Sequence, residues 1–425
     1  MSLENEASAD QIAATEALHT TDEERKRADE LRKNKRWPEA AEAFEKLWQE
    51  KEQSWDGFFW AQALRNAGNG AGALNAARAV FAKHRDFKPV RNLYALCIYD
   101  LEIKELQQIR NEERLFKALE AVKELCEAPE KPGEFNLLNV AVWKAVKIYK
   151  ERVNFPAEAV LRLMNLLDPQ AQETTCYETQ DESGKKIELA SKLEEYYMLK
   201  TKALLQLKRY QECIECCNEA LNKLQKFHYD NDVWFKMRIA QSNAELGEIP
   251  TAIQQLESLL GKRREWFIQR NLADWYLKTG DVPKALKYIL DAALNHGDLD
   301  KKIGVYKSAV EILAQSQRED DARKIVEFIA AIHNEYGKKY DAETAALLEK
   351  YGVSQDHKAD VNKEFRLLKQ RWEEILAELV PPVRGFIKKI NSDGQSGFIE
   401  SDSGRQYYFK FKDLRGKKED FHPGV

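Results

Sequence analysis

The feature that most constrains the fold of this chain is an internal repeat with a spacing of 33 residues. Ala40 and Ala73 are 33 positions apart, and so are Ala252 and Ala285. In each copy a glycine or a polar residue comes a few positions before the alanine, and an apolar pattern of helical period surrounds it. The copies lie at residues 35–44, 68–74, 209–214, 247–253 and 280–286, with weaker ones at 155–160 and 320–326. A period of this length is typical of proteins built from stacked pairs of helices.

Each copy contains the residues that a turn between two packed helices needs. A glycine or a polar residue ends the first helix, and in several copies a proline enters the first turn of the second helix. A small residue then lets the two helices approach closely. The small residues are Ala40, Ala73, Cys213, Ala252 and Ala285. The pattern resembles the tetratricopeptide repeat (TPR), whose period is one residue longer. The resemblance implies a mainly α, right-handed helical solenoid over residues 22–350, with a protein or peptide ligand in its concave groove.

The composition agrees with a helical body. Of the 425 residues, 43% are hydrophobic and 32% are charged, whereas glycine and proline number only 19 and 11. Such a mixture favours helices with one buried face and one solvated face. No window holds 18 consecutive apolar residues, and residues 1–21 are polar and acidic rather than signal-like. We therefore expect a disordered N-terminal tail over residues 1–21 and a soluble, cytoplasmic protein without membrane contact.

Two segments interrupt the repeat pattern. Residues 169–190 contain two short strand-like stretches around a turn signal, which predict a hairpin or a mobile loop inserted between helices. Insertions of this kind often lie on a binding face, and a plain surface excursion is the alternative. Residues 351–383 predict a linker helix with one apolar stripe, which ends at Pro381 and Pro382. We interpret these two prolines as a hinge before a separate module over residues 384–425.

The C-terminal module has the alternating pattern of short β-strands. The strands are predicted at residues 385–391, 396–399 and 406–411, with turn residues between them. Because side chains in a strand alternate between its faces, Phe386, Lys388 and Ile390 should share one face of the first strand. Ile387 and Lys389 should then share the other face. One face is expected to form a core and the other a basic, aromatic platform.

These strands resemble the opening of a cold-shock domain, a family with a small OB-fold barrel. The family motifs G-x-V-K-W-F-N, G-F-G-F-I and V-F-V-H-F correspond to the three predicted strands, and exposed aromatic residues of the family stack on bases. The resemblance implies that Phe398 and Tyr408 stack on bases and that Lys388 and Lys410 contact phosphates. It thereby implies single-stranded RNA or DNA as a partner.

This copy departs from the family pattern in two ways. Lys389, Ile390 and Ser396 stand where the family has aromatic residues, so fewer bases can stack. The segment is also shorter than a five-stranded barrel and ends in what looks like the lead-in to a fourth strand. Either the natural chain continues beyond Val425 or another element completes the sheet. A small β appendage that caps the helical body is the alternative to a nucleic-acid module.

Charge separates the module from the rest of the chain. Residues 384–425 contain nine Lys or Arg against six Asp or Glu, whereas the remainder contains 58 against 65. Nucleic acid is therefore expected on a local basic stripe rather than over the whole body. Further basic candidates outside the module are Lys262, Arg263 and Arg264, which lie beside Trp266, and the pair Lys301 and Lys302. The alternative for each is an ordinary solvated helix end.

No sequence motif indicates catalysis or a cofactor. Cys213 and Cys216 form a single C-x-x-C without the second pair of a zinc site, and buried small positions explain them better. The six cysteines are expected to be reduced thiols. The seven histidines are scattered, and the sequence has no phosphate-binding glycine loop, dinucleotide fingerprint or nucleophile elbow. We therefore predict a protein that is not an enzyme and that binds no metal or cofactor.

The sequence favours a non-enzymatic adaptor. Its helical repeats would hold a protein partner, and its C-terminal module would bind single-stranded RNA or DNA. The alternative is a protein–protein interaction scaffold whose β module does not bind nucleic acid, as the missing aromatic residues indicate. A third class, an enzyme or its regulatory subunit, would require a cofactor, and the sequence contains no motif that indicates one.

Overall fold

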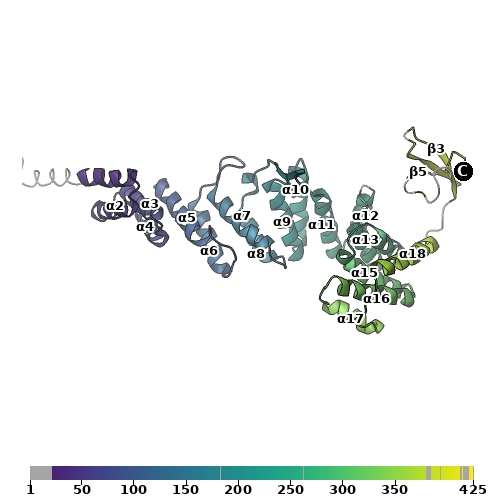
Figure 1. Ribbon diagram of the computed structural model, residues 1–425. Coiled ribbons are helices and arrows are strands. Elements are labelled where there is room, and N and C mark those ends of the chain that lie inside the picture. The colour runs from purple at the N-terminus through teal and green to yellow at the C-terminus, as the bar shows by residue number, and fades with distance from the viewer. Residues whose placement is uncertain are drawn as a thin grey trace, which may run out of the picture. The chain divides into compact units, whose positions relative to one another are not determined.

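The computed structural model describes residues 22–181, 183–261, 263–379, 384–392, 394–411, 414 and 421–424. This part of the chain is mainly α-helical, as predicted, with a two-stranded hairpin and a three-stranded antiparallel sheet near the C-terminus (Figure 1). The chain divides into two units, Met1–Leu246 and Gly247–Val425. Among the described helices, none is long and apolar enough to cross a membrane. The tail predicted over residues 1–21 lies outside the described residues.

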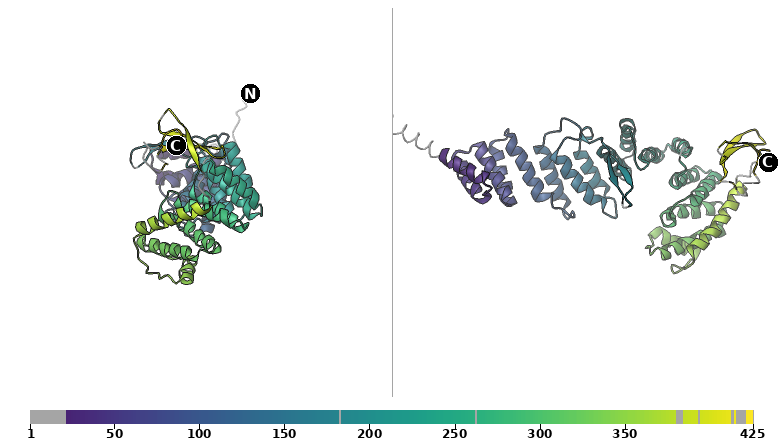
Figure 2. Two further views of the ribbon diagram at one scale, coloured as in Figure 1. Left: turned by 90° about the vertical axis from the view of Figure 1, so that its right-hand side faces the viewer. Right: turned by 45° about the horizontal axis from the view of Figure 1, so that its top comes forward.

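The helices of the first unit form successive TPR-like pairs. Each described helix packs mainly on the helices just before and after it, so most apolar contacts are local in the sequence (Figure 2). After a helix over residues 22–33, the unit contains α2 (Trp37–Lys51), α3 (Ser54–Asn66), α4 (Gly70–Lys83), α5 (Lys88–Glu102), α6 (Glu112–Leu125), α7 (Leu137–Lys150), α8 (Ala157–Leu166), α9 (Lys192–Gln206), α10 (Tyr210–Lys223) and α11 (Asn231–Glu245).

Left-handed turns and small residues join the helices of a pair. Gly68 precedes α4 with a φ of 80°, and Lys35 and Lys208 adopt the same conformation before α2 and α10, with φ of 57° and 59°. Glycine adopts this conformation without the steric cost that other residues meet. The predicted small positions are all 0% exposed: Ala40, Ala73, Cys213, Ala252 and Ala285. The spacing of 33 residues therefore marks the points where helices approach most closely.

The segment predicted as an insertion contains a hairpin. After the 3-10 turn η1 (Pro169–Ala171), β1 (Tyr177–Gln180) pairs antiparallel with β2 (Lys186–Leu189). The Asp181 carboxylate accepts hydrogen bonds from the backbone N–H groups of Ser183 (2.9 Å) and Lys185 (3.0 Å), which closes the turn. β1 is exposed along its length and β2 is only partly buried. The hairpin therefore has no core of its own, and contacts at its base must hold it.

The second unit also consists of paired helices. It contains α12 (Ile249–Leu260), α13 (Trp266–Lys278), α14 (Val282–Leu294), the 3-10 turn η2 (Leu299–Lys302), α15 (Ile303–Gln315), α16 (Glu319–Glu335), α17 (Ala342–Tyr351) and α18 (Val361–Leu379). α13 packs on α14, and α15 packs on both α14 and α16. Leu272, Ile289 and Val326 are fully buried in this packing.

α18 lies within the segment that the sequence predicts as a linker helix, and it packs on α14 and α16. Trp372 is 1% exposed, and its ring centroid lies 6.2 Å from that of Tyr306 in a stacked arrangement. Arg371 forms two hydrogen bonds with the Asp321 carboxylate of α16, at 2.9 and 3.0 Å. α18 is therefore part of the helical body, and the Pro381–Pro382 hinge lies outside the described residues.

The C-terminal sheet has the three strands that the sequence predicts. β3 (Gly385–Ile390), β4 (Ser396–Ser401) and β5 (Gln406–Lys410) pair antiparallel in that order. Beyond them, the Gly424 N–H donates a hydrogen bond of 2.8 Å to the Ile387 carbonyl on the free side of β3. The described residues of this C-terminal segment form only a three-stranded sheet, so the five-stranded OB-fold barrel is not present among them.

A β-bulge corrects the predicted faces of β3. The register shifts between Ile387 and Lys389, so that Ile387 lies opposite Ile399 while Lys389 lies opposite Phe398. Directly opposed residues of an antiparallel pair share a face of the sheet. Lys389 is therefore on the face opposite to that of Ile387, and the expectation that the two share a face is wrong. Phe386 and Ile390, which lie opposite Glu400 and Gly397, are also on different faces, contrary to the prediction. The reason is the extra residue of the bulge, which inverts the alternation along one strand.

Candidate functional site

The predicted nucleic-acid residues lie on the C-terminal sheet, and three of the four share a face. Tyr408 is 55% exposed and lies opposite Phe398, with ring centroids 5.6 Å apart in an edge-to-face arrangement. Lys410 is exposed two positions further along β5 on the same face. Lys389, which the sequence analysis placed on the other face, completes a cross-strand row with Phe398 and Tyr408.

The fourth predicted residue, Lys388, lies at the bulge and forms an ion pair with Glu400. The Lys388 ammonium group donates a hydrogen bond to the Glu400 carboxylate and thereby lowers the pKa of Glu400. A lysine that already neutralises a carboxylate attracts phosphate less strongly than a lysine without such a partner. Lys389, which is exposed, is the better candidate for phosphate contact.

The other predicted basic positions differ in their surroundings. Lys262 lies outside the described residues, and Arg263 and Arg264 lie in the segment between α12 and α13. Lys302 is 0% exposed, and its ammonium group donates hydrogen bonds of 2.7 Å to the carbonyls of Ala293 and Asn295. The prediction that Lys302 belongs to a surface basic pair is therefore wrong. Its long aliphatic stem allowed it to be buried with its charge directed at backbone carbonyls.

The C-x-x-C cysteines lie on the buried face of α10. Cys213 and Cys217 are 0% exposed and Cys216 is 7% exposed. Burial raises the pKa of the Cys216 thiol to about 12. The hydrogen bond with Cys217 acts in the opposite direction and lowers the pKa of Cys213, but Cys213 is fully buried and therefore inaccessible to a redox partner. The buried positions agree with the packing role that the sequence analysis preferred for these residues.

A cluster of exposed and half-buried aromatic rings lies in the first repeats, and we call it the Trp55 cluster. It consists of Trp55, Phe58, Phe59 and Phe87. Trp55 is 52% exposed and lies 5.6 Å from Phe58, 5.6 Å from Phe59 and 5.0 Å from Phe87, measured between ring centroids. The sequence analysis missed this cluster. The spacing of Trp55, Phe58 and Phe59 on one helix, three and four positions apart, was the available signal.

A surface hollow of about 480 Å³ lies between α5 and the segment that leads from α6 to α7. Leu96, Cys126 and Leu137 contribute apolar lining, and Glu127 and Glu130 contribute carboxylates. Phe135, which is 77% exposed, lies at this hollow. Glu127 is paired with Lys88 and Arg91 of α5, and both cations lower the pKa of its carboxyl group. The hollow therefore combines apolar and acidic groups.

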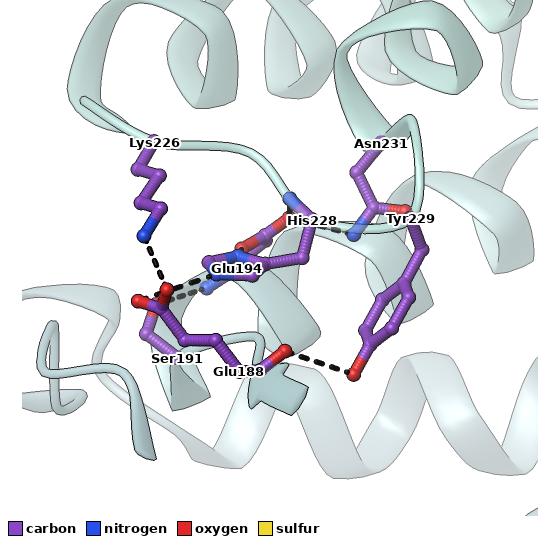
Figure 3. A network of polar contacts seen from close by, with 7 residues as sticks. All are labelled: Glu188, Ser191, Glu194, Lys226, His228, Tyr229 and Asn231. Atoms are coloured by element: carbon purple, nitrogen blue, oxygen red, sulfur yellow. Dashed lines mark hydrogen bonds and ion pairs between the residues drawn. The ribbon is translucent and has the colours of Figure 1, made fainter. Parts of the chain in front are cut away.

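A buried polar network holds the base of the hairpin against α9 and α11 (Figure 3). Glu194 of α9 is 0% exposed, and its Oε1 accepts hydrogen bonds of 2.7 Å from the backbone N–H of His228 and from the Asn231 side chain. Its Oε2 lies 2.7 Å from Nδ1 of His228. Ser191 caps α9 by accepting a hydrogen bond from the Glu194 N–H. Three hydrogen-bond donors thus compensate the free-energy cost of burying the Glu194 carboxylate.

The same network reaches the hairpin through Glu188 of β2. Lys226 donates a hydrogen bond to Oε2 of Glu188, and the Tyr229 hydroxyl donates one of 3.4 Å to the Glu188 backbone carbonyl. Oε1 of Glu188 lies 3.6 Å from Nε2 of His228. Tyr229 and Asp230 have left-handed backbone conformations, with φ of 52° and 58°. The strained turn before α11 is therefore held in place by contacts to Glu194 and to the hairpin.

Comparison with known proteins finds likeness to solved TPR structures at low identity. No protein-family model matches the chain, and no curated protein matches its sequence. A tetratricopeptide repeat protein from Parabacteroides merdae has 12% identity and a TM-score of 0.31, over 79% of this chain and 99% of that chain. The C-terminal part of a TPR repeat-containing protein from Cytophaga hutchinsonii has 14% identity and a TM-score of 0.29, over 76% and 95%.

The TPR2AB domain of yeast Sti1, in complex with pHSP90, has 14% identity and a TM-score of 0.25, over 72% of this chain and 96% of that chain. Because all three TM-scores are below 0.5, the description of the fold rests on the helix pairs, turns and buried small residues of this chain. On those features the chain is a TPR-like helical-repeat protein with a small three-stranded sheet near its C-terminus.

Proposed function

We propose that this protein is a non-enzymatic interaction scaffold whose helical repeats bind a protein or peptide partner. The observation that supports this proposal is the Trp55 cluster, in which a half-exposed tryptophan is held by three neighbouring rings. Tryptophan is enriched among the residues that contribute most to protein–protein binding. Adjacent helical repeats are well suited to present such an anchor, because they form a continuous surface from short elements.

The start of α3, which contains Trp55, is fixed by contacts to the helix over residues 22–33. Asp56 is 2% exposed and forms two hydrogen bonds with the Arg25 guanidinium, at 2.7 and 3.0 Å. The Arg32 guanidinium lies 4.3 Å from the ring centroid of Phe59. These contacts restrict the rotation of the aromatic side chains. A pre-organised anchor loses little conformational entropy on binding, which favours affinity.

The chemistry of the Trp55 cluster favours an apolar side chain of the partner. Stacked and edge-to-face rings offer a large apolar contact area, whereas the nearby Arg32 is already paired with Asp29. We therefore propose a peptide segment with an aromatic or branched apolar residue. The proposal assigns no catalytic activity to the chain.

Selection from a random peptide-display library against the purified chain tests this proposal. Peptides that bind specifically would be measured by fluorescence anisotropy against the wild type and the Trp55→Ala variant. We expect the substitution to weaken binding by about 2 kcal/mol, or roughly thirtyfold, as for a typical hot-spot residue. Tyr336→Ala is the matched control, because Tyr336 is similarly exposed (47%) and lies in the second unit.

Peptides that bind the wild type and Trp55→Ala equally well would exclude the Trp55 cluster as the binding surface. If no peptide binds specifically, the scaffold function itself is contradicted. Circular dichroism of each variant separates a loss of binding from a loss of folding, since Trp55 is half exposed and its truncation should leave the helices intact.

Binding of single-stranded nucleic acid at the C-terminal sheet is the second candidate function. The row formed by Lys389, Phe398 and Tyr408, with Lys410 nearby, is the observation that favours it. Stacking contributes about 1–3 kcal/mol per base, so two aromatic rings support only weak binding without further contacts. Cold-shock identity of the sheet remains part of this proposal.

Anisotropy of a labelled single-stranded RNA with the Tyr408→Ala and Tyr407→Ala variants tests the second candidate. Tyr407 is similarly exposed (45%) but lies opposite Ile399, on the other face of the sheet. If the row binds bases, Tyr408→Ala weakens a salt-sensitive interaction and Tyr407→Ala does not. Absence of binding, or equal effects of the two substitutions, would leave the scaffold as the function of the whole chain.

A further inference from the structure

We propose that Cys176, Glu188 and His228 form a binding site for a zinc ion at the base of the hairpin. Cys176 directly precedes β1, Glu188 lies in β2, and His228 lies in the segment between α10 and α11. One sulfur, oxygen or nitrogen atom of each side chain lies within 4.8 Å of the corresponding atoms of the other two. Among the described residues, no other group of three such side chains comes together in this way.

The orientation of His228 is the first argument for a metal ion. The side chain is 8% exposed, and its Nδ1 lies 2.7 Å from the buried Glu194 carboxylate. The carboxylate holds the proton on Nδ1, so the lone pair of the neutral ring lies on Nε2. A histidine that binds a metal through one nitrogen commonly donates a hydrogen bond from the other to a carboxylate. Glu194 and His228 have this arrangement.

The second argument is that Nε2 of His228 makes no hydrogen bond with the described residues although it is buried. It is directed toward Glu188, whose Oε1 lies 3.6 Å away, beyond hydrogen-bond distance. Nε2 of His333 and Nε2 of His357 also make no hydrogen bond, but among the described residues neither lies with two further potential ligands. A metal ion between the three side chains would supply the missing partner.

The donor set favours zinc over other biological metals. Thiolate and imidazole are the ligands that bind Zn²⁺ tightly, and a carboxylate often completes its coordination, whereas Ca²⁺ and Mg²⁺ prefer oxygen ligands alone. Ligands of a tetrahedral zinc ion lie at about 2.0–2.3 Å from the metal and therefore about 3.3–3.6 Å from one another. The separation of 3.6 Å between Nε2 of His228 and Oε1 of Glu188 already fits this geometry.

Charge and access also fit a divalent cation. Lys226 occupies only Oε2 of Glu188 and leaves Oε1 directed at His228. Zn²⁺ would replace the thiol proton of Cys176, which is released to solvent, so thiolate and carboxylate together balance the charge of the ion. The Glu188 side chain is 34% exposed, so the site opens to solvent on that side. A water molecule can therefore fill the fourth position.

A zinc ion at this place would fasten the hairpin to the helical body. Cys176 and Glu188 lie at the open end of the hairpin, where Glu178 pairs with Glu188, and His228 belongs to the turn before α11. The hairpin has little buried surface of its own, so a metal would add a rigid connection to the contacts that Lys226 and Tyr229 make with Glu188. This proposal differs from the sequence-based prediction that the chain binds no metal.

Metal binding to the full, untagged chain tests the site. After removal of metal by a chelator, the protein would be titrated with Zn²⁺ and, as a spectroscopic probe, with Co²⁺. We expect one ion per chain, a thiolate-to-cobalt charge-transfer band, and the visible bands of tetrahedral Co²⁺. Cys176→Ser should remove the charge-transfer band, and His228→Gln should weaken Zn²⁺ binding by at least tenfold. The matched controls Cys126→Ser and His296→Gln should bind as the wild type does, since neither residue lies in the cluster.

Alkylation of the wild type provides a second measurement that requires no substitution. Cys176 and Cys126 are both partly buried, so their modification by a maleimide can be compared in one sample by peptide mass spectrometry. Zn²⁺ should protect Cys176 at least tenfold and leave Cys126 unchanged. The proposal is overturned if no ion binds at one equivalent, if the test variants bind zinc as tightly as the controls, or if Zn²⁺ does not alter the alkylation of Cys176.

Discussion

At the scale of the residue, Lys302 shows how burial changes the chemistry of a charged group. It is 0% exposed, and backbone carbonyls of Ala293 and Asn295 accept its hydrogen bonds at 2.7 Å. Burial penalises the charged form and lowers the pKa of Lys302 to about 8. The surrounding side chains include Tyr306, whose ring centroid lies 6.0 Å from the ammonium nitrogen.

This pKa predicts a stability that rises with pH. The unfolded lysine has a pKa of about 10.4, so between pH 8 and that value the unfolded state binds more protons than the folded state. The cost of burying the charge is therefore present below pH 8 and is relieved as the pH rises. We expect the free energy of unfolding of the wild type to rise by about 2 kcal/mol, relative to that of Lys302→Met, between pH 7 and pH 10. Urea unfolding at several pH values measures it, and a difference independent of pH would contradict it.

Lys208 precedes α10 in the same left-handed conformation in which Gly68 precedes α4. We therefore predict that glycine at position 208 stabilises the protein. The φ of 59° at Lys208 is left-handed, which costs an L-residue about 1–2 kcal/mol, and the Lys208 side chain is exposed. Lys208→Gly removes that cost but adds about 0.5–1 kcal/mol of unfolded-state entropy. We expect a net gain of up to about 1 kcal/mol in urea unfolding. Gly280→Ala, at a φ of 83°, is the control and should destabilise by a similar amount. A less stable Lys208→Gly variant would refute this account of the turn.

At the scale of the element, close contacts between helices depend on small residues. Gly57 of α3 is buried between α2 and α4. A Cβ atom at this position would lie 2.5 Å from Cγ2 of Val80 and 2.7 Å from Cε3 of Trp48. Neither the branched valine nor the indole ring is the flexible end of a long side chain. Two neighbouring helices therefore constrain this glycine at once.

Gly57→Ala should destabilise the first repeats although alanine is the better helix former. The gain in helix propensity is about 1 kcal/mol, whereas overpacking typically costs about 1–3 kcal/mol. We expect a net loss of about 1 kcal/mol in thermal or urea unfolding. Gly70→Ala in α4 is the matched control, because its Cβ would meet only Leu101 at 3.7 Å, an ordinary contact distance. Equal effects of the two substitutions would show that helix propensity rather than packing determines the change in stability.

At the scale of the whole molecule, stability should be local because the contacts are local. Most described helices pack mainly on their neighbours in the sequence, with α18 on α14 and α16 as an exception, and the chain divides into two units at Leu246 and Gly247. In repeat architectures, stability is approximately a sum over repeats and the interfaces between neighbours. A defect in one part should therefore spread only a short distance along the chain.

Trp372→Ala tests this locality. Trp372 of α18 is 1% exposed and contacts Tyr306, so its truncation should cost about 3–5 kcal/mol. Hydrogen exchange followed by mass spectrometry should show lost protection in α14, α15, α16 and α18, with the first unit unchanged. Leu367→Ala on the same helix is the control, because Leu367 is 60% exposed. Loss of protection throughout the chain would mean that the molecule unfolds as one cooperative unit.

The sequence predicted the helical pairs well because their determinants are near one another in the chain. The small residues such as Ala73 and Ala285 were identified by spacing alone and are fully buried. The three C-terminal strands followed from alternation, but the face of Lys389 was predicted wrongly. The face of Lys389 is determined by the bulge. The bulge depends on how β3 pairs with β4, and no pattern within β3 itself indicates a bulge.

What the sequence by itself determined is the repeated helix pair, its turns and the order of helical body and sheet, since these depend on interactions between residues a few positions apart. Only the tertiary structure decided which charges are buried, as with Lys302 and Glu194, and which distant side chains meet. Cys176, Glu188 and His228 come from three segments that only the hairpin pairing and the packing of α9 and α11 bring together. Contacts of this kind depend on the path of the whole chain, and local sequence does not specify that path.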